Sequence, residues 1–159
     1  MQIESTRFGS IEIRDDAVIT FPDGLIGLPG TRWALLAQSE SAAFYWLHSV
    51  DDPAIALPVT NPWLFFSDYE VSVPDEDAGL LNLVSADQAD IFCVVRASDR
   101  IEEFTINLRG PLVVHAGDRR GRQVINERDY DVRQPLFAHV TLADIRPSQP
   151  AAPVAATGI

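Results

Sequence analysis

The chain has 159 residues, of which 47% are hydrophobic and 9% aromatic. A chain of this length buries about 70% of its unfolded surface around one core, so a disordered body is excluded. Its 12 cationic residues are all Arg, against 23 Asp and Glu, and the net charge of -11 repels phosphate. Direct nucleic-acid binding is therefore disfavoured, and a basic partner fits better.

The first sixty residues alternate between short apolar stretches and turn residues. Gly9 and Ser10 separate the first two stretches, a pattern typical of a β-hairpin. Later breaks contain Pro, Asp, Asn or Gly, which is turn chemistry. We predict strands over residues 3–8, 11–14, 17–21, 33–37, 44–50 and 54–60.

The second half continues in the same way, with stretches rich in β-branched and aromatic residues. Leu80, Leu81 and Leu83 follow Pro74 and predict a short helix within 75–84, and a second short helix is possible at 85–89. The basic run 119–122 is interpreted as a solvated hairpin tip, with Gly121 at a positive φ. We predict strands over residues 70–73, 91–97, 104–108, 112–116 and 123–126.

Many short strands with so little helix predict an all-β, mostly antiparallel fold, either a sandwich or a small closed barrel, with one or two short helices. The barrel is favoured because residues 44–47 are apolar on both faces and need cover outside as well as inside. Residues 1–146 are expected to form one domain. Residues 147–159, rich in Ala and Pro and uncharged, are expected to be a flexible tail of little importance to stability.

The common catalytic motifs are absent, and the three His residues are too far apart for a usual zinc site, so no catalytic residue, cofactor or metal is predicted. His48 with Asp51 or Asp52 is a possible catalytic base and its orienting carboxylate. An Asx-type turn at Asp51 or Asp52 is the favoured interpretation. Cys93 lies in an apolar run and is expected to be buried.

Neither a signal peptide nor a membrane-spanning stretch is recognised, so a cytoplasmic location and no membrane association are expected. The run 62–69 contains four bulky apolar residues in succession and then an Asp and a Tyr. Some of these side chains are expected to be exposed as anchors for a protein partner, since aromatics beside carboxylates are typical of interfaces. The alternative is that two face the barrel and two pack under a loop.

Three stretches together resemble the FliW family of flagellar assembly factors, in order and in spacing, over about residues 2–137. They are FPDGLIG at 21–27, FYWLHSVDDP at 44–53, and TINL at 105–108 continuing through Pro111 to RGRQVI at 120–125. The sequence departs from the family pattern at Gly110, where Ala is more usual, and in its tail.

The resemblance implies a compact β-barrel-like fold and no enzymatic activity. It also implies two alternative protein partners: flagellin and the RNA-binding translational regulator CsrA, which free FliW antagonises. The -11 charge suits the basic surface that CsrA needs for RNA. The residues expected to bind partners are Asp51, Asp52, Phe65, Phe66, Asp68, Tyr69 and Asn107. Two other classes stay open: a small β-barrel enzyme using His48, and a barrel that encloses an apolar ligand.

Overall fold

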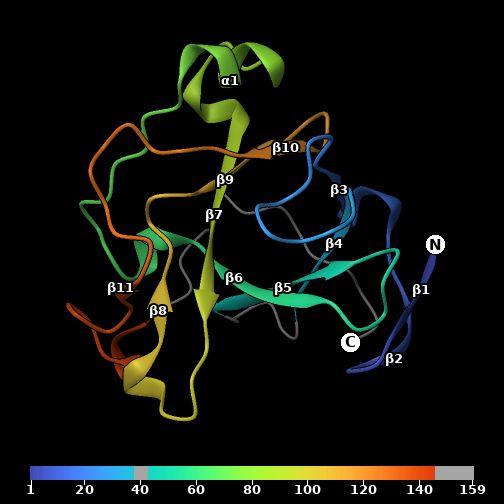
Figure 1. The fold of residues 1–159 in the computed structure, drawn as a ribbon, viewed down its shortest axis with the longest axis horizontal. Coiled ribbons are helices and arrows are strands. Elements are labelled where there is room, and N and C mark those ends of the chain that lie inside the picture. Colours follow the sequence, from blue (N-terminus) through green and yellow to red (C-terminus); the bar gives the residue numbers. More distant parts are fainter. Residues whose placement is uncertain (38–42, 146–159) are drawn as a thin grey trace.

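The computed structural model describes residues 1–37 and 43–145, and strands dominate this part of the chain (Figure 1). The strands are β1 Gln2–Ser5, β2 Gly9–Glu12, β3 Val18–Thr20, β4 Arg32–Leu36, β5 Phe44–Ser49, β6 Ala56–Thr60, β7 Ala89–Arg96, β8 Thr105–Ile106, β9 Leu112–His115, β10 Arg120–Gln123 and β11 Gln134–Pro135. One α-helix, α1 Asp75–Leu80, is accompanied by the 3-10 turns η1 Asp15–Ala17, η2 Pro62–Leu64, η3 Ala86–Gln88, η4 Ile101–Glu103 and η5 Leu142–Asp144.

Seven strands close into a barrel in the order β7-β6-β5-β4-β3-β10-β9, and β9 pairs again with β7. The closure depends on β7, whose first half pairs with β9 and whose second half pairs with β6. All pairings are antiparallel except β10 with β3, which is parallel and joins one pair of residues, Arg120 and Thr20. The predicted all-β, mostly antiparallel barrel with short helices is confirmed.

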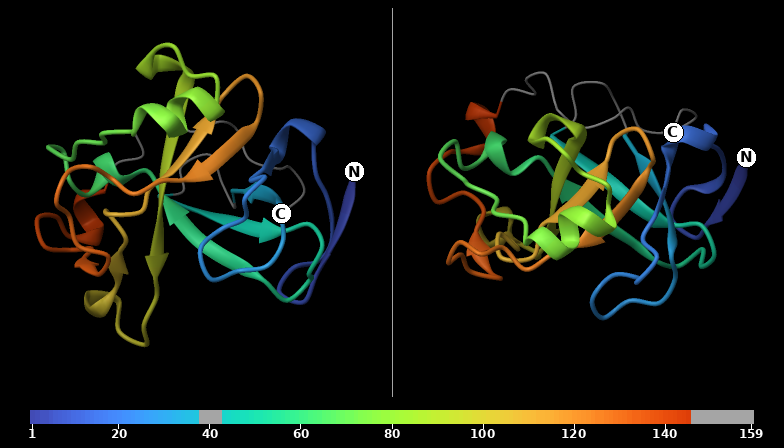
Figure 2. Two further views of the ribbon diagram at one scale, coloured as in Figure 1. Left: turned by 45° about the horizontal axis from the view of Figure 1, so that its top comes forward. Right: turned by 90° about the horizontal axis from the view of Figure 1, so that it is seen from above.

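The barrel interior is filled by apolar side chains, and three further apolar clusters of described residues lie outside it. Trp33, Leu35 and Leu47 belong to the interior core. The hairpin of β1 and β2 covers an outer core that includes Leu36 and Trp46. A further core lies against β7 and β8. The segment 136–145, which contributes to this core, lies on the side of the molecule opposite this hairpin in both views of Figure 2. The apolar character of β5 on both faces is explained, because alternate side chains enter different cores.

Two of the predicted strands are wrong: one is not a strand, and the other is displaced along the chain. Residues 70–73 form no strand, because side chains bind their backbone: Glu70 N–H donates to Tyr130 Oη and Ser72 N–H donates to Asn126 Oδ1. The strand predicted at 123–126 begins three residues earlier, as β10. The first hairpin also turns at 6–8 rather than at 9–10, where Ser5 Oγ accepts from two backbone N–H groups.

The prediction that Gly121 forms a hairpin tip at positive φ is wrong. Gly121 is buried within β10, and the turn lies before it, where Arg119 takes the positive φ of 56°. The His115 ring stabilises this turn, because Nδ1 accepts from the backbone N–H groups of Gly117 and Asp118. The predicted helix appears as α1, and the possible second helix appears as the short turn η3. The tail expected at 147–159 lies outside the described residues.

Candidate functional site

The two carboxylates of the turn between β5 and β6 differ in what they do. Asp51 is exposed and forms an ion pair with Arg32, with 2.7 Å between Oδ1 and Nη2. Asp52 Oδ1 accepts from the backbone N–H of Ala54 at 2.9 Å, which is an Asx turn. Ser49 Oγ accepts from the backbone N–H groups of both Asp residues. The favoured interpretation of this turn is thus confirmed for Asp52.

His48 is completely buried between two serines. Its Nδ1 lies 2.7 Å from the carbonyl oxygen of Ser49, and its Nε2 lies 2.8 Å from Ser5 Oγ. Both ring nitrogens therefore bind serine oxygens rather than Asp51 or Asp52. The base and orienting carboxylate of the enzyme hypothesis are not brought together. Within residues 1–37 and 43–145, no cluster of three or more His, Cys, Asp or Glu side chains is suited to a metal ion.

The aromatic side chains predicted as anchors are core residues. Phe65, Phe66 and Tyr69 are 1%, 5% and 4% exposed and belong to the core against β7 and β8. Their expected exposure is wrong because β7 and β8 leave an apolar face outside the barrel that these rings cover. Trp63, at 37% exposure, is the aromatic side chain of this run that reaches the surface, while Leu64 is half-buried. Asp68 is exposed.

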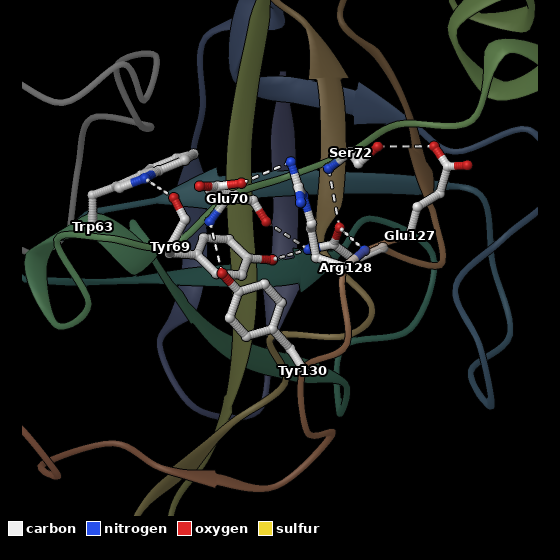
Figure 3. A network of polar contacts seen from close by, with 8 residues as sticks. Trp63, Tyr69, Glu70, Ser72, Glu127, Arg128 and Tyr130 are labelled. Atoms are coloured by element: carbon white, nitrogen blue, oxygen red, sulfur yellow. Dashed lines mark hydrogen bonds and ion pairs between the residues drawn. The ribbon is translucent and has the colours of Figure 1, made fainter.

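Tyr69 is the centre of a polar network that holds the segment after η2 in place (Figure 3). Its Oη donates to the carbonyl of Leu108 at 2.7 Å and accepts from Asn126 Nδ2 at 3.2 Å. Burial raises the pKa of the Tyr69 phenol well above its usual value. Trp63 Nε1 donates to the carbonyl of Tyr69, and Arg128 pairs with Glu70 at 3.0 Å. The network links residues 63–72 to residues 126–130, so Tyr69 has a structural role.

The residues predicted to bind partners do not form one surface. The turn with Asp51 and Asp52 adjoins Ser49 at one end of β5, whereas Phe65 packs on Phe44 at the other. A strand of six residues separates these ends by roughly 17 Å. Asn107 belongs to neither region: its Oδ1 accepts from the backbone N–H groups of Arg109 and Gly110, forming a tight turn.

Two apolar grooves that the sequence did not reveal open on the surface. The first, which we call the arginine groove, has a volume of about 440 Å³ and contains Asn107 in its wall. The second, the α1 groove, has a volume of about 780 Å³ and lies between α1, η3, Trp63 and β7. Val84, at 87% exposure, stands at the edge of the α1 groove, and Asp87 and Asp90 also line it.

Several other buried or half-buried ionisable groups also have shifted pKa values. Burial raises the pKa of the Asp90 carboxyl to about 6, although the guanidinium of Arg119, with Nη1 4.0 Å from Oδ2, acts in the opposite direction. Burial lowers the pKa of Arg119, whose guanidinium nitrogens make no hydrogen bond within the described part of the chain. Burial also raises the pKa of the Cys93 thiol to about 12, as expected for an inert core cysteine.

The fold and these surfaces define a small, closed β-barrel protein with a filled interior and apolar grooves open to solvent. No helix in residues 1–37 and 43–145 combines the length and apolar character required of a membrane span.

The family model described as FliW protein matches residues 2–136, and the chain belongs to this family of flagellar assembly factors. A flagellar assembly factor FliW from Magnetococcus marinus is 42% identical over 139 residues, which cover 86% of this chain and 85% of the relative. Its counterpart from Natranaerobius thermophilus is 34% identical over 140 residues, covering 86% and 93%. A crystal structure of the flagellar assembly factor FliW superposes with a TM-score of 0.77 at 26% identity, covering 86% of this chain and 97% of that one.

Proposed function

We propose that this chain is a non-enzymatic, cytoplasmic assembly factor that binds flagellin and, when free of flagellin, binds and antagonises CsrA. Through this exchange it would adjust flagellin synthesis to filament assembly. The observation that carries the proposal is membership of the FliW family, with a match over residues 2–136. The filled barrel supports binding through the outer surface rather than enclosure of a small ligand.

Charge favours the α1 groove as the surface for CsrA. A protein that binds RNA presents cations to the phosphates, so its capture requires carboxylates around an apolar contact. The first turn of α1 carries Asp75 and Glu76 beside the groove, whereas Asp77 is already paired with Arg122, and Asp87 lines the groove itself. Val84 and Leu80, 87% and 55% exposed, offer aliphatic contact area beside these acids.

The residues predicted to bind partners remain in the proposal, but their proposed roles differ from direct contact with a partner. Asp51, Asp52 and Asp68 would steer a basic partner from a distance, since exposed carboxylates act mainly on association rates. Phe65, Phe66 and Tyr69 would act indirectly, by fixing the segment that presents Trp63 and Asp68. Asn107 would shape the wall of the arginine groove.

The experiment measures binding of the purified chain to flagellin and to CsrA from the same organism. The parent should bind each, and flagellin should reduce the capture of CsrA. Val84→Asp places a charge on the edge of the α1 groove and should weaken CsrA at least tenfold, because losing an apolar anchor costs about 2 kcal/mol. Ile125→Asp makes the same change at an exposed aliphatic position of the other groove and should leave CsrA binding intact. A parent that binds neither protein contradicts the proposal.

A further inference from the structure

The arginine groove opens at one end of the barrel, and its floor is part of the barrel core. Leu25, Leu28, Leu57 and Val94 line the groove and also belong to or pack against the interior cluster. Three aliphatic side chains at its margin are strongly exposed: Ile26 at 68%, Ile125 at 53% and Val132 at 54%. Its volume of about 440 Å³ lies within the range of roughly 300–1,000 Å³ found for binding pockets.

Internal hydrogen bonds hold the walls of this groove in place. Gln123 accepts from the backbone N–H of Ile26 at 3.0 Å and donates to the carbonyl of Gly110 at 3.0 Å. The loop that follows β3 is thereby tied to the turn held by Asn107. A Cβ on Gly110 would lie 3.1 Å from Asn107 Nδ2 and 3.2 Å from Gln123 Nε2, so glycine allows this close packing. The groove is therefore pre-formed, which lowers the entropic cost of binding.

Three of the chain's 12 arginines line this groove and no Asp or Glu among the described residues does, although the net charge of the chain is -11. Arg96, Arg109 and Arg133 line it, and all three are exposed. Arg109 pairs with the exposed Asp129 at 3.6 Å. The guanidinium groups of Arg96 and Arg133 form no ion pair or hydrogen bond with any residue that the structure describes, although the chain contains 23 carboxylates.

The aliphatic walls and the unpaired arginines together determine which kind of ligand this groove can bind. Aliphatic walls bind apolar side chains, and free guanidinium groups bind carboxylates through paired, charge-assisted hydrogen bonds. A basic surface would meet three like charges here and is disfavoured. The arginine groove thus suits a peptide segment with apolar side chains and neighbouring Asp or Glu, and not the cationic RNA-binding face of a regulator.

We propose that the arginine groove binds a segment of flagellin in which apolar side chains enter the groove and flanking carboxylates pair with Arg96 and Arg133. The inference rests on the proposed function and assigns its two partners to different faces. Flagellin occupies the arginine groove and CsrA occupies the acidic α1 groove, so the competition between them arises from overlap of the two bound proteins outside the grooves and not from a shared groove.

The test uses full-length flagellin and overlapping short peptides that tile its sequence, titrated against the folded chain. The parent should bind full-length flagellin and at least one peptide that combines aliphatic or aromatic residues with Asp or Glu. Arg96→Glu and Arg133→Glu should each weaken both interactions at least tenfold, because each variant loses a charge-assisted hydrogen bond to a carboxylate and places a like charge opposite it. Arg120→Glu, at an exposed Arg in β10 outside the groove, makes the same charge change and should alter binding less than twofold.

Reversing the charges of both the peptide and the arginine distinguishes a direct contact between them from a general effect of net charge. A bound peptide whose carboxylate is replaced by Lys should lose affinity for the parent and regain it for Arg96→Glu or Arg133→Glu. The inference is overturned, and the proposed function retained, when flagellin binds the parent but the groove variants bind as well as Arg120→Glu. It is also overturned when the groove variants lose CsrA and keep flagellin, or when the bound peptides are basic. Failure of the parent to bind flagellin overturns the proposed function as well.

Discussion

Gly121 is enclosed by the barrel on the side where any other residue has a Cβ. An added Cβ would lie 2.7 Å from Phe21 Cε1 and 3.1 Å from both the carbonyl oxygen of Val113 and Cγ2 of Val114. The Phe21 ring is 1% exposed and belongs to the interior core, so it has little room to withdraw. The requirement for glycine here is one of space, not of φ, since β10 is ordinary extended backbone.

Gly121→Ala should therefore destabilise the protein by about 1–3 kcal/mol, the usual cost of forcing extra atoms into a packed core. Gly79→Ala is the matched control, because a Cβ there has nothing within 4 Å and the position lies in α1. That change should be neutral or stabilising by up to about 1 kcal/mol. Urea unfolding midpoints would measure both. Equal midpoints for the two variants would contradict the packing argument.

Asp90 is predicted to make the stability of the protein depend on pH. Its carboxyl is 6% exposed, and its pKa of about 6 is above the ordinary value of 3.8. A raised pKa in the folded state means that the contribution of this group to stability is complete below pH 3.8 and is lost as pH rises through 6. The parent therefore loses stability between pH 4 and pH 7, whereas Asp90→Asn has no carboxyl to titrate and does not. The unfolding free energy of the variant minus that of the parent should rise by on the order of 2 kcal/mol over this range.

The measurement is urea unfolding of the parent and Asp90→Asn across that pH range. Asp68→Asn also removes one negative charge, but from an exposed position, and controls for net charge. A constant difference between parent and Asp90→Asn at all pH values would show that the carboxyl does not titrate between its ordinary pKa and 6.

At the scale of elements, side chains replace strand pairing in the segment after η2. The backbone N–H groups of Glu70 and Ser72 donate to Tyr130 and Asn126, and Tyr69 Oη joins Asn126 to the carbonyl of Leu108. This arrangement explains why residues 70–73 belong to no sheet. It also places the rings of Phe65, Phe66 and Tyr69 over the apolar outer face of β7 and β8.

Tyr69→Phe should destabilise the protein by about 1–3 kcal/mol, because it leaves the Leu108 carbonyl and one N–H of the Asn126 side chain unsatisfied in a buried place. Tyr130→Phe makes the same atomic change where the phenol accepts one bond at the surface, and it should cost less than about 1 kcal/mol. Thermal unfolding of the two variants compares them. A larger loss for Tyr130→Phe would show that Tyr69 is not the centre of the network.

The predictable part of the fold is the part governed by local pattern. Alternating apolar residues located β3 to β7 to within a few residues, and Pro74 with the following leucines located α1. The pattern failed at β10, where Arg-Gly-Arg resembles a turn but pairs with β9, because the choice of Gly121 depends on the distant Phe21. It failed again at Phe65, Phe66 and Tyr69, since the two apolar faces of residues 44–47 predict that the outside of the barrel is covered but do not show which residues cover it.

At the scale of the whole molecule, the arginine groove was beyond sequence analysis for a topological reason. Arg96, Arg109 and Arg133 come from three separate segments and meet near Ile26 only after the barrel closes. Each of these arginines directly follows an aliphatic residue, but this local signal is too common to indicate a site. The family resemblance was recognisable because it depends on short motifs in a fixed order, and such motifs do not require knowledge of which segments become neighbours.

The distribution of charge over the whole molecule leads to the last prediction, which concerns the rate of binding to CsrA. A net charge of -11 produces a long-range field, and exposed carboxylates such as Asp51 and Asp68 contribute to it without being buried by the partner. The double variant Asp51→Asn and Asp68→Asn should slow association with CsrA by about twofold at low salt and reduce its dependence on salt, with little change in dissociation.

Surface plasmon resonance at two salt concentrations measures both rate constants, and Val84→Asp provides the comparison. That variant changes an apolar contact and should act chiefly by faster dissociation at either salt concentration, because short-range packing is hardly screened. If the carboxylate variant instead accelerates dissociation, Asp51 or Asp68 lies inside the interface and forms a direct contact. If neither rate constant changes, the field of the molecule does not guide this partner, and the acidic composition serves another purpose.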